Sequence, residues 1–225
     1  MRPALDAVLF DLDGTLLDTA PDFHWTLNAL LAEEGQPEIG FDLLRAHVSN
    51  GARAMVGAAF ELTLDDPRFD RLHQRMLALY ETHLAVDTCL FEGLDTLLTT
   101  LESNSIPWGI VTNKPERYTT PLLKGLGLTE RAGTVICPDQ VNLRKPDPES
   151  LFLACREINR RPEHCVYVGD HIRDIEAGRR AGMRTVAAGY GYVDADDSIE
   201  DWQADHNIQH GSELLPLLNS LYSMD

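Results

Sequence analysis

Two aspartates stand close together near the amino terminus, directly after a short apolar run. The segment Val8–Thr15 reads V-L-F-D-L-D-G-T, so one residue separates Asp11 from Asp13, and Gly14 permits a tight turn behind them. In open α/β sheets, ligands bind at the carboxyl ends of strands, where both carboxylates would stand. Carboxylates held this close repel each other unless a cation lies between them or one is protonated. Mg²⁺ is the expected cation, because it prefers oxygen ligands and commonly pairs with a substrate phosphate.

Three later segments also place polar groups after apolar runs or before a helix. Thr112 and Asn113 supply a hydroxyl and an amide, neutral donors that suit phosphoryl oxygens. Lys145 precedes a predicted helix, where its charge and the helix dipole both favour an anion. Asp170 ends a further run, and Asp174 follows about one helical turn later. Taken singly, each feature is a weak signal, because such residues usually form a cap, a turn or a solvated charge, but their order predicts a site for an anion.

Apolar runs alternate with helical patterns, and these elements must position the polar residues. Helices are predicted from Pro115 to Gly127 and from the pair Asp147–Pro148 onward. Strands alternating with helices predict the α/β class with a doubly wound parallel sheet. The predicted strands are short and apolar on both faces, as in buried parallel sheets. They are Ala7–Phe10, Trp108–Thr112, Thr134–Cys137, Cys165–Val168 and Thr185–Ala188.

One long segment, from about residue 21 to residue 85, breaks this alternation and shows only helical periodicity. Asp22 is the expected N-cap of its first helix, and a later helix is expected to open near Pro67. The alternative is one continuous domain with a long helical excursion. We predict an all-helical module inserted into an α/β core, with residues 19–87 as the module and residues 1–18 and 88–225 as the core.

The net charge of the chain argues against some classes of partner. Its 225 residues include 36 Asp and Glu against 19 Lys and Arg, which leaves a formal net charge of −17. Because a polyanion repels a polyanion, we expect neither nucleic-acid binding nor docking on an anionic membrane. A few basic residues gathered at one site can still bind a small phosphate ligand.

The cysteines and the amino terminus indicate the compartment. The four cysteines form no C-x-x-C pair and have no regular spacing, which is typical of buried, reduced thiols. No apolar run approaches the ~20 residues that span a bilayer. The first residues lack the long apolar region and the cleavage site of a signal peptide. We expect a cytoplasmic protein, either a monomer or a homodimer.

In order along the chain, the motifs D-x-D-G-T, T-N, K-P-D-P and V-G-D-x-x-x-D resemble the four motifs of the haloacid dehalogenase superfamily. They run from residue 8 to residue 174. The helical module lies where the phosphoglycolate-phosphatase-like branch of that superfamily carries a small helical cap. The resemblance implies a Rossmann-like core and Mg²⁺-dependent hydrolysis of a small phosphate monoester.

Carried over residue by residue, the resemblance assigns a role to each motif. Asp11 would be the nucleophile that forms an aspartyl-phosphate. Asp13 would be the general acid/base, which protonates the leaving oxygen and then accepts a proton from the attacking water. The implied phosphate-binding residues are Thr112, Asn113 and Lys145. The implied Mg²⁺ ligands are Asp11, Asp170 and the backbone carbonyl of Asp13.

One residue departs from the superfamily pattern. Many relatives carry a second acid directly after the residue that matches Asp170, whereas this chain has His171. Metal binding would then involve Asp174, directly or through water. The presence of Asp13 together with Lys145 and Asp170 favours a phosphatase over a metal-independent dehalogenase. A sugar-phosphate mutase would keep all of these residues and remains an alternative.

Substrate choice is expected to come from the helical module, because the core contacts only the phosphate. Gly51, Ala52 and Arg53 resemble the specificity loop of the family and would present backbone amides and a guanidinium to a substrate carboxylate. Arg53 is equally compatible with an exposed helix charge. The stretches G-A-R-A-M-V, W-G-I-V-T-N-K-P and G-Y-G-Y resemble one group within the branch, the N-acetylmuramic acid 6-phosphate phosphatases of pseudomonads, which act in peptidoglycan recycling. The alternative substrate, 2-phosphoglycolate, also carries a carboxylate.

An alternative from a different class is a signalling receiver domain, which also combines paired acids with an acceptor Asp, a Thr and a Lys. Receiver domains are about half this length and need their acceptor on a middle strand. No apolar run between Phe10 and Trp108 offers such an aspartate. The sequence therefore favours a catalyst that turns over many phosphates.

Overall fold

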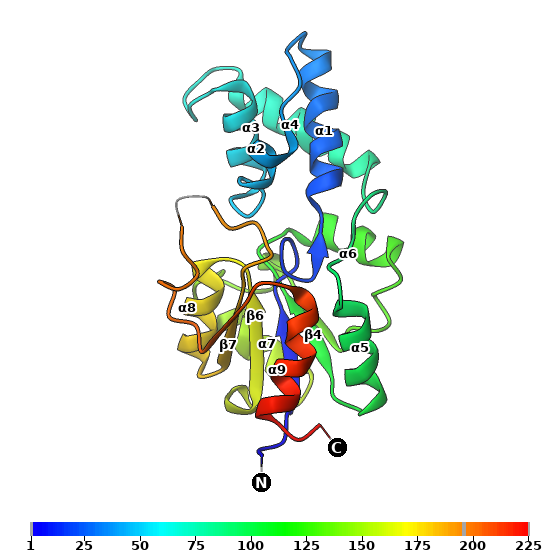
Figure 1. Ribbon diagram of the computed structural model, residues 1–225. Helices are drawn as coiled ribbons and strands as arrows, with labels where there is room; N and C mark the ends of the chain where they lie inside the picture. The colour runs from blue at the N-terminus through cyan, green and yellow to red at the C-terminus, as the bar shows by residue number, and fades with distance from the viewer. Residues whose placement is uncertain (1, 195–196, 225) are drawn as a thin grey trace.

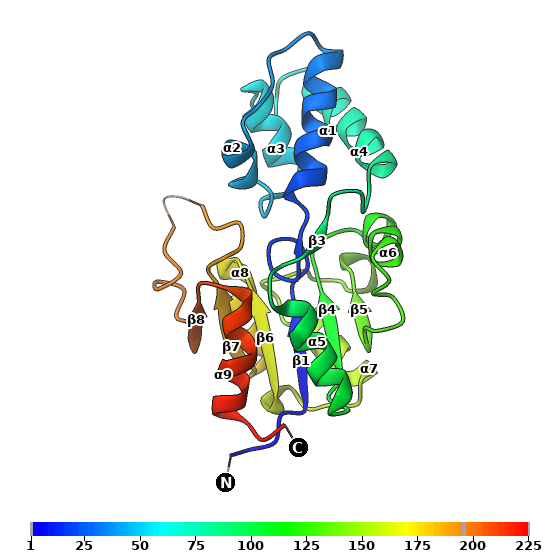
Figure 2. The ribbon, with the colours of Figure 1, turned by 45° about the vertical axis from the view of Figure 1, so that its right-hand side comes forward.

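A central parallel sheet organises the larger part of the computed structural model, which describes residues 2–194 and 197–224. Its strand order is β5-β4-β1-β6-β7-β8 (Figures 1 and 2). The strands are β1 (Ala7–Phe10), β4 (Trp108–Val111), β5 (Thr134–Ile136), β6 (Cys165–Gly169), β7 (Arg184–Ala188) and β8 (His206–Ile208). The chain adds β4 and β5 on one side of β1 and the later strands on the other, so the sheet is doubly wound, as predicted.

Strand β1 lies between β4 and β6, with Leu9 opposite Gly109 on one side and Tyr167 on the other. All four residues of β1 are fully buried. Because successive side chains of a strand point to opposite faces, Val8 and Phe10 pack in one hydrophobic cluster, whereas Ala7 and Leu9 pack in another. This burial on both faces explains why the strand is uniformly apolar up to its last residue, Phe10, which directly precedes Asp11.

Five helices cover the two faces of the sheet, and we call this assembly the sheet unit. They are α5 (Leu94–Ser103), α6 (Glu116–Gly125), α7 (Glu149–Glu157), α8 (Ile172–Ala181) and α9 (Leu214–Leu221). Buried residues of α5, α6 and α9 pack with Val8 and Phe10, and those of α7 and α8 pack with Ala7 and Leu9. Gly127 has a φ of +67° just after α6, which agrees with its predicted place at the end of that helix.

Four helices between residues 20 and 82 form a second unit above the carboxyl ends of the strands (Figure 1), which we call the helical bundle. They are α1 (Ala20–Glu33), α2 (Phe41–Arg45), α3 (Gly51–Phe60) and α4 (Phe69–Thr82). The bundle has its own hydrophobic cluster, in which Leu27 of α1 and Met55 of α3 are fully or almost fully buried. In α4 the buried residues follow the three- and four-residue spacing seen in the sequence. They are Phe69, Leu72, Met76 and Tyr80.

Two short strands, β2 (Leu17–Asp18) and β3 (Cys89–Leu90), carry the chain into and out of the helical bundle. They pair antiparallel, with Leu17 opposite Leu90 and Asp18 opposite Cys89. Neither strand was predicted, because two residues carry no periodicity. The edge strand β8 was also missed, since only one of its three residues is buried.

The predicted N-cap role of Asp22 is wrong. Helix α1 already begins at Ala20, and Asp22 lies inside its first turn. The hydroxyl of Tyr192 accepts hydrogen bonds from the backbone N–H groups of Thr19 at 2.6 Å and Ala20 at 2.8 Å, so a distant residue caps this helix. The buried Asp22 carboxylate instead accepts hydrogen bonds from the returning linker, including one from Thr88 Oγ1 at 2.6 Å.

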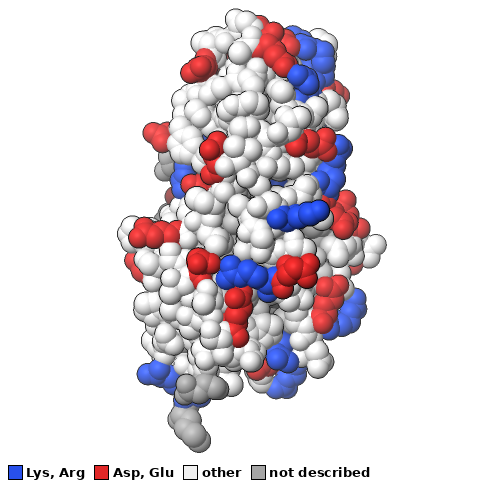
Figure 3. Space-filling view, turned by 90° about the vertical axis from the view of Figure 1, so that its right-hand side faces the viewer, with Lys and Arg blue, Asp and Glu red and all other residues white. Residues whose placement is uncertain are grey.

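On the face that carries α6, acidic and basic side chains are interleaved and no extended basic patch is visible (Figure 3). Within residues 2–194 and 197–224, no helix combines the length and the apolar character that crossing a bilayer requires.

Candidate active site

The carboxyl ends of β1, β4 and β6 meet beneath the helical bundle. Asp11, Thr112 and Asp170 directly follow these three strands. A cavity of about 430 Å³ lies there, with walls from both units. The sheet unit and the loop before α1 contribute Asp11, Asp13, Thr112, Asn113, Lys114, Pro115, Tyr118, Arg144 and Arg173, and the helical bundle contributes Phe23, Val48, Ser49, Asn50, Gly51, Ala52, Arg53, His73, Leu77 and Tyr80.

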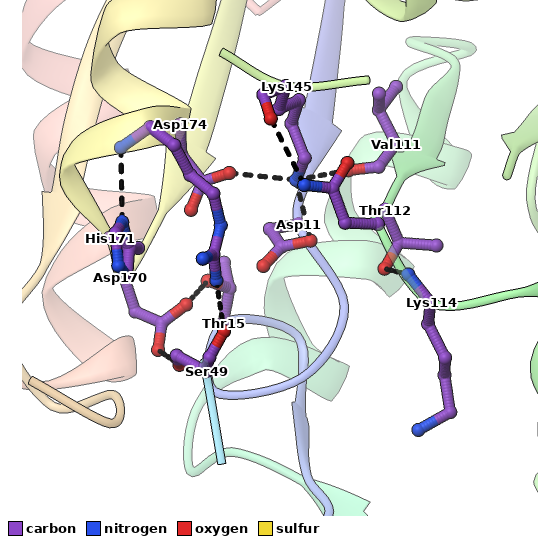
Figure 4. Close-up of polar contacts among 12 residues, drawn as sticks. Asp11, Thr15, Ser49, Val111, Thr112, Lys114, Lys145, Asp170, His171 and Asp174 are labelled. Atoms are coloured by element: carbon purple, nitrogen blue, oxygen red, sulfur yellow. Dashed lines mark hydrogen bonds and ion pairs between the residues drawn. The ribbon is translucent and has the colours of Figure 1, made fainter. Parts of the chain in front are cut away.

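Lys145 is buried beside Asp11, with its ammonium between two carboxylates (Figure 4). Its Nζ is 2.8 Å from Asp11 Oδ1 and 2.7 Å from Asp174 Oδ1. It also donates to the hydroxyl of Tyr167 at 2.8 Å and to the carbonyl oxygen of Val111 at 2.9 Å. Burial by itself would lower the pKa of Lys145, but the two carboxylates raise it above its ordinary value. The lysine is therefore a fixed positive charge that orients Asp11.

Three buried carboxylates surround a point beside this lysine. One oxygen each of Asp11, Asp170 and Asp174 lies within 4.8 Å of the others. Burial, with Asp11 and Asp174 as neighbours, raises the pKa of Asp170 to about 7. Asp174 Oδ2 is buried and accepts no hydrogen bond from the described residues. Lys145 alone does not compensate three carboxylates, so these oxygen donors fit a hard divalent cation.

Asp170 is held from three directions. It accepts hydrogen bonds from Thr15 Oγ1 at 3.0 Å, from the backbone N–H of Tyr192 at 2.9 Å and from Ser49 Oγ at 2.9 Å. Ser49 belongs to the helical bundle, so the bundle reaches a carboxylate of the cation site directly (Figure 4). Gly14 has a φ of +83°, and a Cβ there would lie 2.1 Å from Asp170 Oδ2, which explains the glycine after the D-x-D pair.

His171, which replaces the second acid of the superfamily pattern, is the N-cap of α8. Its Nδ1 accepts a hydrogen bond from the backbone N–H of Arg173 at 3.1 Å. Burial and the charge of Arg173 lower the pKa of His171 to about 4, and a neutral ring is the form that accepts this bond. The fully buried Asp174 is the other acid that lies near Asp11 and Asp170.

Asp13 lies nearer the helical bundle than Asp11 does. Its Oδ1 accepts hydrogen bonds from Thr19 Oγ1 at 2.7 Å and from Lys114 Nζ at 2.8 Å. The Lys114 ammonium also donates to the hydroxyl of Tyr80 in α4 at 2.8 Å. No hydrogen bond to Asp13 Oδ2 occurs among the described residues, so that oxygen is available to a ligand.

The two predicted phosphate-binding residues after β4 have different surroundings. Thr112 Oγ1 accepts from the backbone N–H of Lys114 at 3.1 Å, which leaves its hydroxyl proton free to be donated into the cavity. Asn113 donates its amide N–H to the carbonyl oxygen of Lys145 at 3.2 Å, and so ties the loop after β4 to the loop that carries the lysine.

Gly51, Ala52 and Arg53 begin α3 and lie in the wall of the cavity. The guanidinium of Arg53 is half-exposed, lies 3.4 Å from Asp70 Oδ1 and covers the Phe69 ring at 4.7 Å. It is therefore close to the cavity but partly engaged by the bundle itself.

Lys114, Tyr80 and Arg173 are among the residues with contacts in the site that had no role in the sequence interpretation. Lys114 directly follows the T-N motif, a position that signalled a cation, but nothing local shows that it faces Asp13. Tyr80 was visible only as part of an apolar helix stripe. Arg173 stands between Asp170 and Asp174 in the sequence, and its guanidinium donates a hydrogen bond to the carbonyl oxygen of Ser49.

Comparison with known proteins identifies the family. The sequence profile of the haloacid dehalogenase-like hydrolases matches residues 8–188, which include every motif described above. The chain belongs to this family. An N-acetylmuramic acid 6-phosphate phosphatase of Pseudomonas putida is 47% identical over 96% of this chain and 97% of that protein. A phosphoglycolate phosphatase of Xanthomonas campestris pv. campestris is 45% identical over 92% and 94%, respectively. The predicted enzyme class, a phosphatase of this family, is confirmed.

A solved structure shows the same fold. The crystal structure of a predicted phosphoglycolate phosphatase from Haemophilus somnus superposes with a TM-score of 0.82 over 95% of this chain and 97% of that chain. The two sequences are 24% identical, so the likeness concerns the fold. The Rossmann-like architecture expected for this family member is thereby confirmed.

Proposed function

We propose that this phosphatase hydrolyses N-acetylmuramic acid 6-phosphate, a sugar phosphate with a carboxylate, through an aspartyl-phosphate on Asp11. The reaction is supported by the position of Asp11, which lines the cavity and whose Oδ1 is held by the buried Lys145. The other carboxylate oxygen is then free to attack phosphorus. Fixed opposite charges suit phosphoryl transfer, in which alignment and charge compensation do most of the work.

In the first step, a bond forms between Asp11 and phosphorus while the bond from phosphorus to the sugar oxygen breaks. The proton on Asp13 passes to that oxygen, so the sugar leaves as a neutral alcohol. In the second step, water attacks the aspartyl-phosphate and gives its proton to Asp13. Orthophosphate leaves, and the Asp11 carboxylate is restored.

The phosphoryl group is bound by donors that already surround Asp11. Lys145 supplies its charge, Thr112 its free hydroxyl proton and Asn113 the connection between their two loops. The residues that would hold Mg²⁺ are Asp11, Asp170 and the backbone carbonyl of Asp13, and a carboxylate oxygen of Asp174 lies within 4.8 Å of oxygens of Asp11 and Asp170. When bound, the ion would compensate the charge of the phosphate and of the carboxylates that approach it.

The cavity supports a substrate larger than phosphoglycolate. Its volume of about 430 Å³ is in the range of sites for sugar-sized ligands, whereas glycolate has only two carbons. Apolar and aromatic side chains provide room for an uncharged body. They are Phe23, Val48, Leu77, Tyr80 and Tyr118.

The charge of the cavity supports a substrate with a second anionic group. The whole chain has almost two acidic residues for each basic one, whereas the cavity wall has four basic side chains and two acidic ones. The basic side chains are Arg53, Lys114, Arg144 and Arg173. We assign residues 19–87 to a cap that closes over the substrate, with Gly51, Ala52 and Arg53 facing the carboxylate.

The test is kcat/KM for phosphate release in the presence of Mg²⁺ on N-acetylmuramic acid 6-phosphate, 2-phosphoglycolate and glucose 6-phosphate. We expect a preference of at least about a hundredfold, or ~2.7 kcal/mol, for the first substrate. A preference for 2-phosphoglycolate would transfer the assignment to that substrate. Isomerisation of glucose phosphates without net phosphate release would show a mutase instead.

A further inference from the structure

Lys114 has contacts that the phosphate chemistry does not explain. Its side chain is only 6% exposed, and it extends from the end of β4 away from the Asp11–Lys145 pair (Figure 4). Its Nζ lies 2.8 Å from Asp13 Oδ1 and 2.8 Å from the Tyr80 hydroxyl. The ammonium also lies 4.7 Å from the centre of the Phe23 ring and 4.8 Å from that of Tyr80.

These contacts form a bridge between the two units of the molecule. A buried ammonium is costly unless it is paired, and two of the groups that surround Lys114, the rings of Phe23 and Tyr80, belong to the helical bundle. The rings stack on each other, with centroids 4.1 Å apart and an interplanar angle of 15°. The environment of Lys114 is therefore complete only when the bundle lies against the sheet unit.

The bridge constrains one oxygen of Asp13 and leaves the other free. Lys114 and Thr19 both donate to Oδ1, which limits rotation of the carboxyl group, while Oδ2 has no hydrogen-bond partner among the described residues. An acid that exchanges a proton with the leaving oxygen needs this arrangement, because the reacting oxygen must be free and correctly directed.

We propose that Lys114 is a positioning residue for Asp13, held in place by Tyr80 of the helical bundle. The inference rests on the proposed function of Asp13 as general acid/base. In the first step, the proton on Asp13 Oδ2 moves to the leaving oxygen as its bond to phosphorus breaks, and Lys114 keeps all of its own protons. Seating of the bundle on the sheet unit thus directs the acid toward the leaving group.

The leaving group provides the test. A sugar or alkyl alkoxide must be protonated as it departs, whereas nitrophenolate leaves without protonation. The experiment compares kcat/KM for p-nitrophenyl phosphate with kcat/KM for the fastest alkyl monoester of the substrate panel. This parameter reports the steps up to the release of the leaving group, so the later hydrolysis of the aspartyl-phosphate does not affect it.

For Lys114→Met, we expect the loss of kcat/KM on the alkyl ester to exceed the loss on the aryl ester by at least about tenfold. The larger part of the alkyl loss is expected in kcat. Tyr80→Phe keeps the ring and removes only the hydroxyl. It should also lower kcat/KM more on the alkyl ester than on the aryl ester, by a smaller factor. Lys114→Arg should recover part of the loss.

Arg117→Met is the matched control. Arg117 of α6 forms an exposed ion pair with Glu81 of α4, with Arg117 Nη2 2.5 Å from Glu81 Oε1. It joins the sheet unit to the bundle without contacting Asp13. We expect equal, small effects on both esters. If this variant reproduced the selective loss, general attachment of the bundle would explain the result and the inference would be wrong.

Asp13→Asn separates this inference from the proposed function. In one outcome, Asp13→Asn lowers kcat/KM selectively on the alkyl ester, whereas Lys114→Met and Tyr80→Phe lower kcat/KM equally on both esters or on neither. Asp13 would then keep its role as general acid/base, and the positioning role of Lys114 would be wrong. If Asp13→Asn itself shows no selective loss, the general-acid role fails and this inference fails with it. Thermal unfolding of each variant identifies any that does not fold. If Lys114→Met does not fold, the comparison of the two esters is made with Tyr80→Phe.

Discussion

The sheet unit and the helical bundle line the two sides of one cavity with different kinds of side chain. On the side of the sheet unit, charged groups are fixed by other charged groups, as Lys145 is between Asp11 and Asp174. On the side of the bundle, the wall consists mainly of apolar and aromatic side chains and the first residues of α3. Ser49 and Tyr80 are the points where the bundle reaches the charged groups.

This difference separates the chemistry from the choice of substrate. Phosphoryl transfer depends on charges that do not reorganise, and burial among parallel strands and loops holds them in place. Selection among substrates depends on the shape of the cavity and on the charges at its rim. Substitutions in the small helical bundle can change both without disturbing the sheet. The predictions below test how complete this separation is.

Asp11→Asn should have the largest effect, because it removes the nucleophile and leaves the packing of β1 unchanged. We expect kcat/KM for phosphate release to fall at least about a thousandfold on every substrate. Circular dichroism and the midpoint of thermal unfolding should stay close to those of the unsubstituted protein. Substantial residual turnover would show that another group attacks phosphorus.

Removal of divalent cations should affect all substrates alike, since the three carboxylates belong to the sheet unit. With EDTA, we expect phosphate release to fall by more than about a hundredfold and to return when Mg²⁺ is added in excess. Calorimetric titration of Mg²⁺ into the Asp170→Asn variant should show weakened binding. Full activity in the chelator would contradict the cation site.

Asp22→Ala tests the boundary between the two units. The buried Asp22 carboxylate connects α1 with the returning linker through the backbone N–H of Asp87 at 2.7 Å and Thr88 Oγ1 at 2.6 Å. Its loss leaves the buried Thr88 hydroxyl and the partly buried Asp87 N–H unpaired, so we expect the free energy of unfolding to fall by about 2–3 kcal/mol in urea titrations. Asp87→Ala is the control, because it keeps the backbone donor and should change stability by less than about 0.5 kcal/mol.

Arg53→Ala should have the smallest effect and the most selective one. We expect kcat/KM to fall about tenfold on carboxylate-bearing monoesters and less than about twofold on p-nitrophenyl phosphate. Arg71→Ala, which removes another exposed arginine of the bundle paired with Glu34, should change neither value. Equal losses on both kinds of ester would make Arg53 a structural residue, and the substrate carboxylate would then have to be bound elsewhere.

Much of the fold followed from local patterns. Strand β1 was predicted with the bounds observed, and the strands that match β4, β5, β6 and β7 were predicted to within one residue at either end. Their apolar residues are buried on both faces, which gives a clear signal. The pair β2 and β3 is too short for any period, and the start of α1 depends on Tyr192, which is distant in sequence. Such features depend on contacts that no window of neighbouring residues contains.

The sequence by itself determined the α/β class and the order in which acids, donors and a lysine follow the strands, because these are properties of composition and spacing. Its four motifs indicated the family through their resemblance to those of known proteins. Only the tertiary structure decided which carboxylate oxygen of Asp11 and of Asp13 accepts hydrogen bonds from the described residues and which does not. It alone showed that Lys114 joins Asp13 to Tyr80 and that Ser49 reaches Asp170. These contacts join segments whose relative positions are set by packing of the whole chain, and burial among them is what gives the charges their strength.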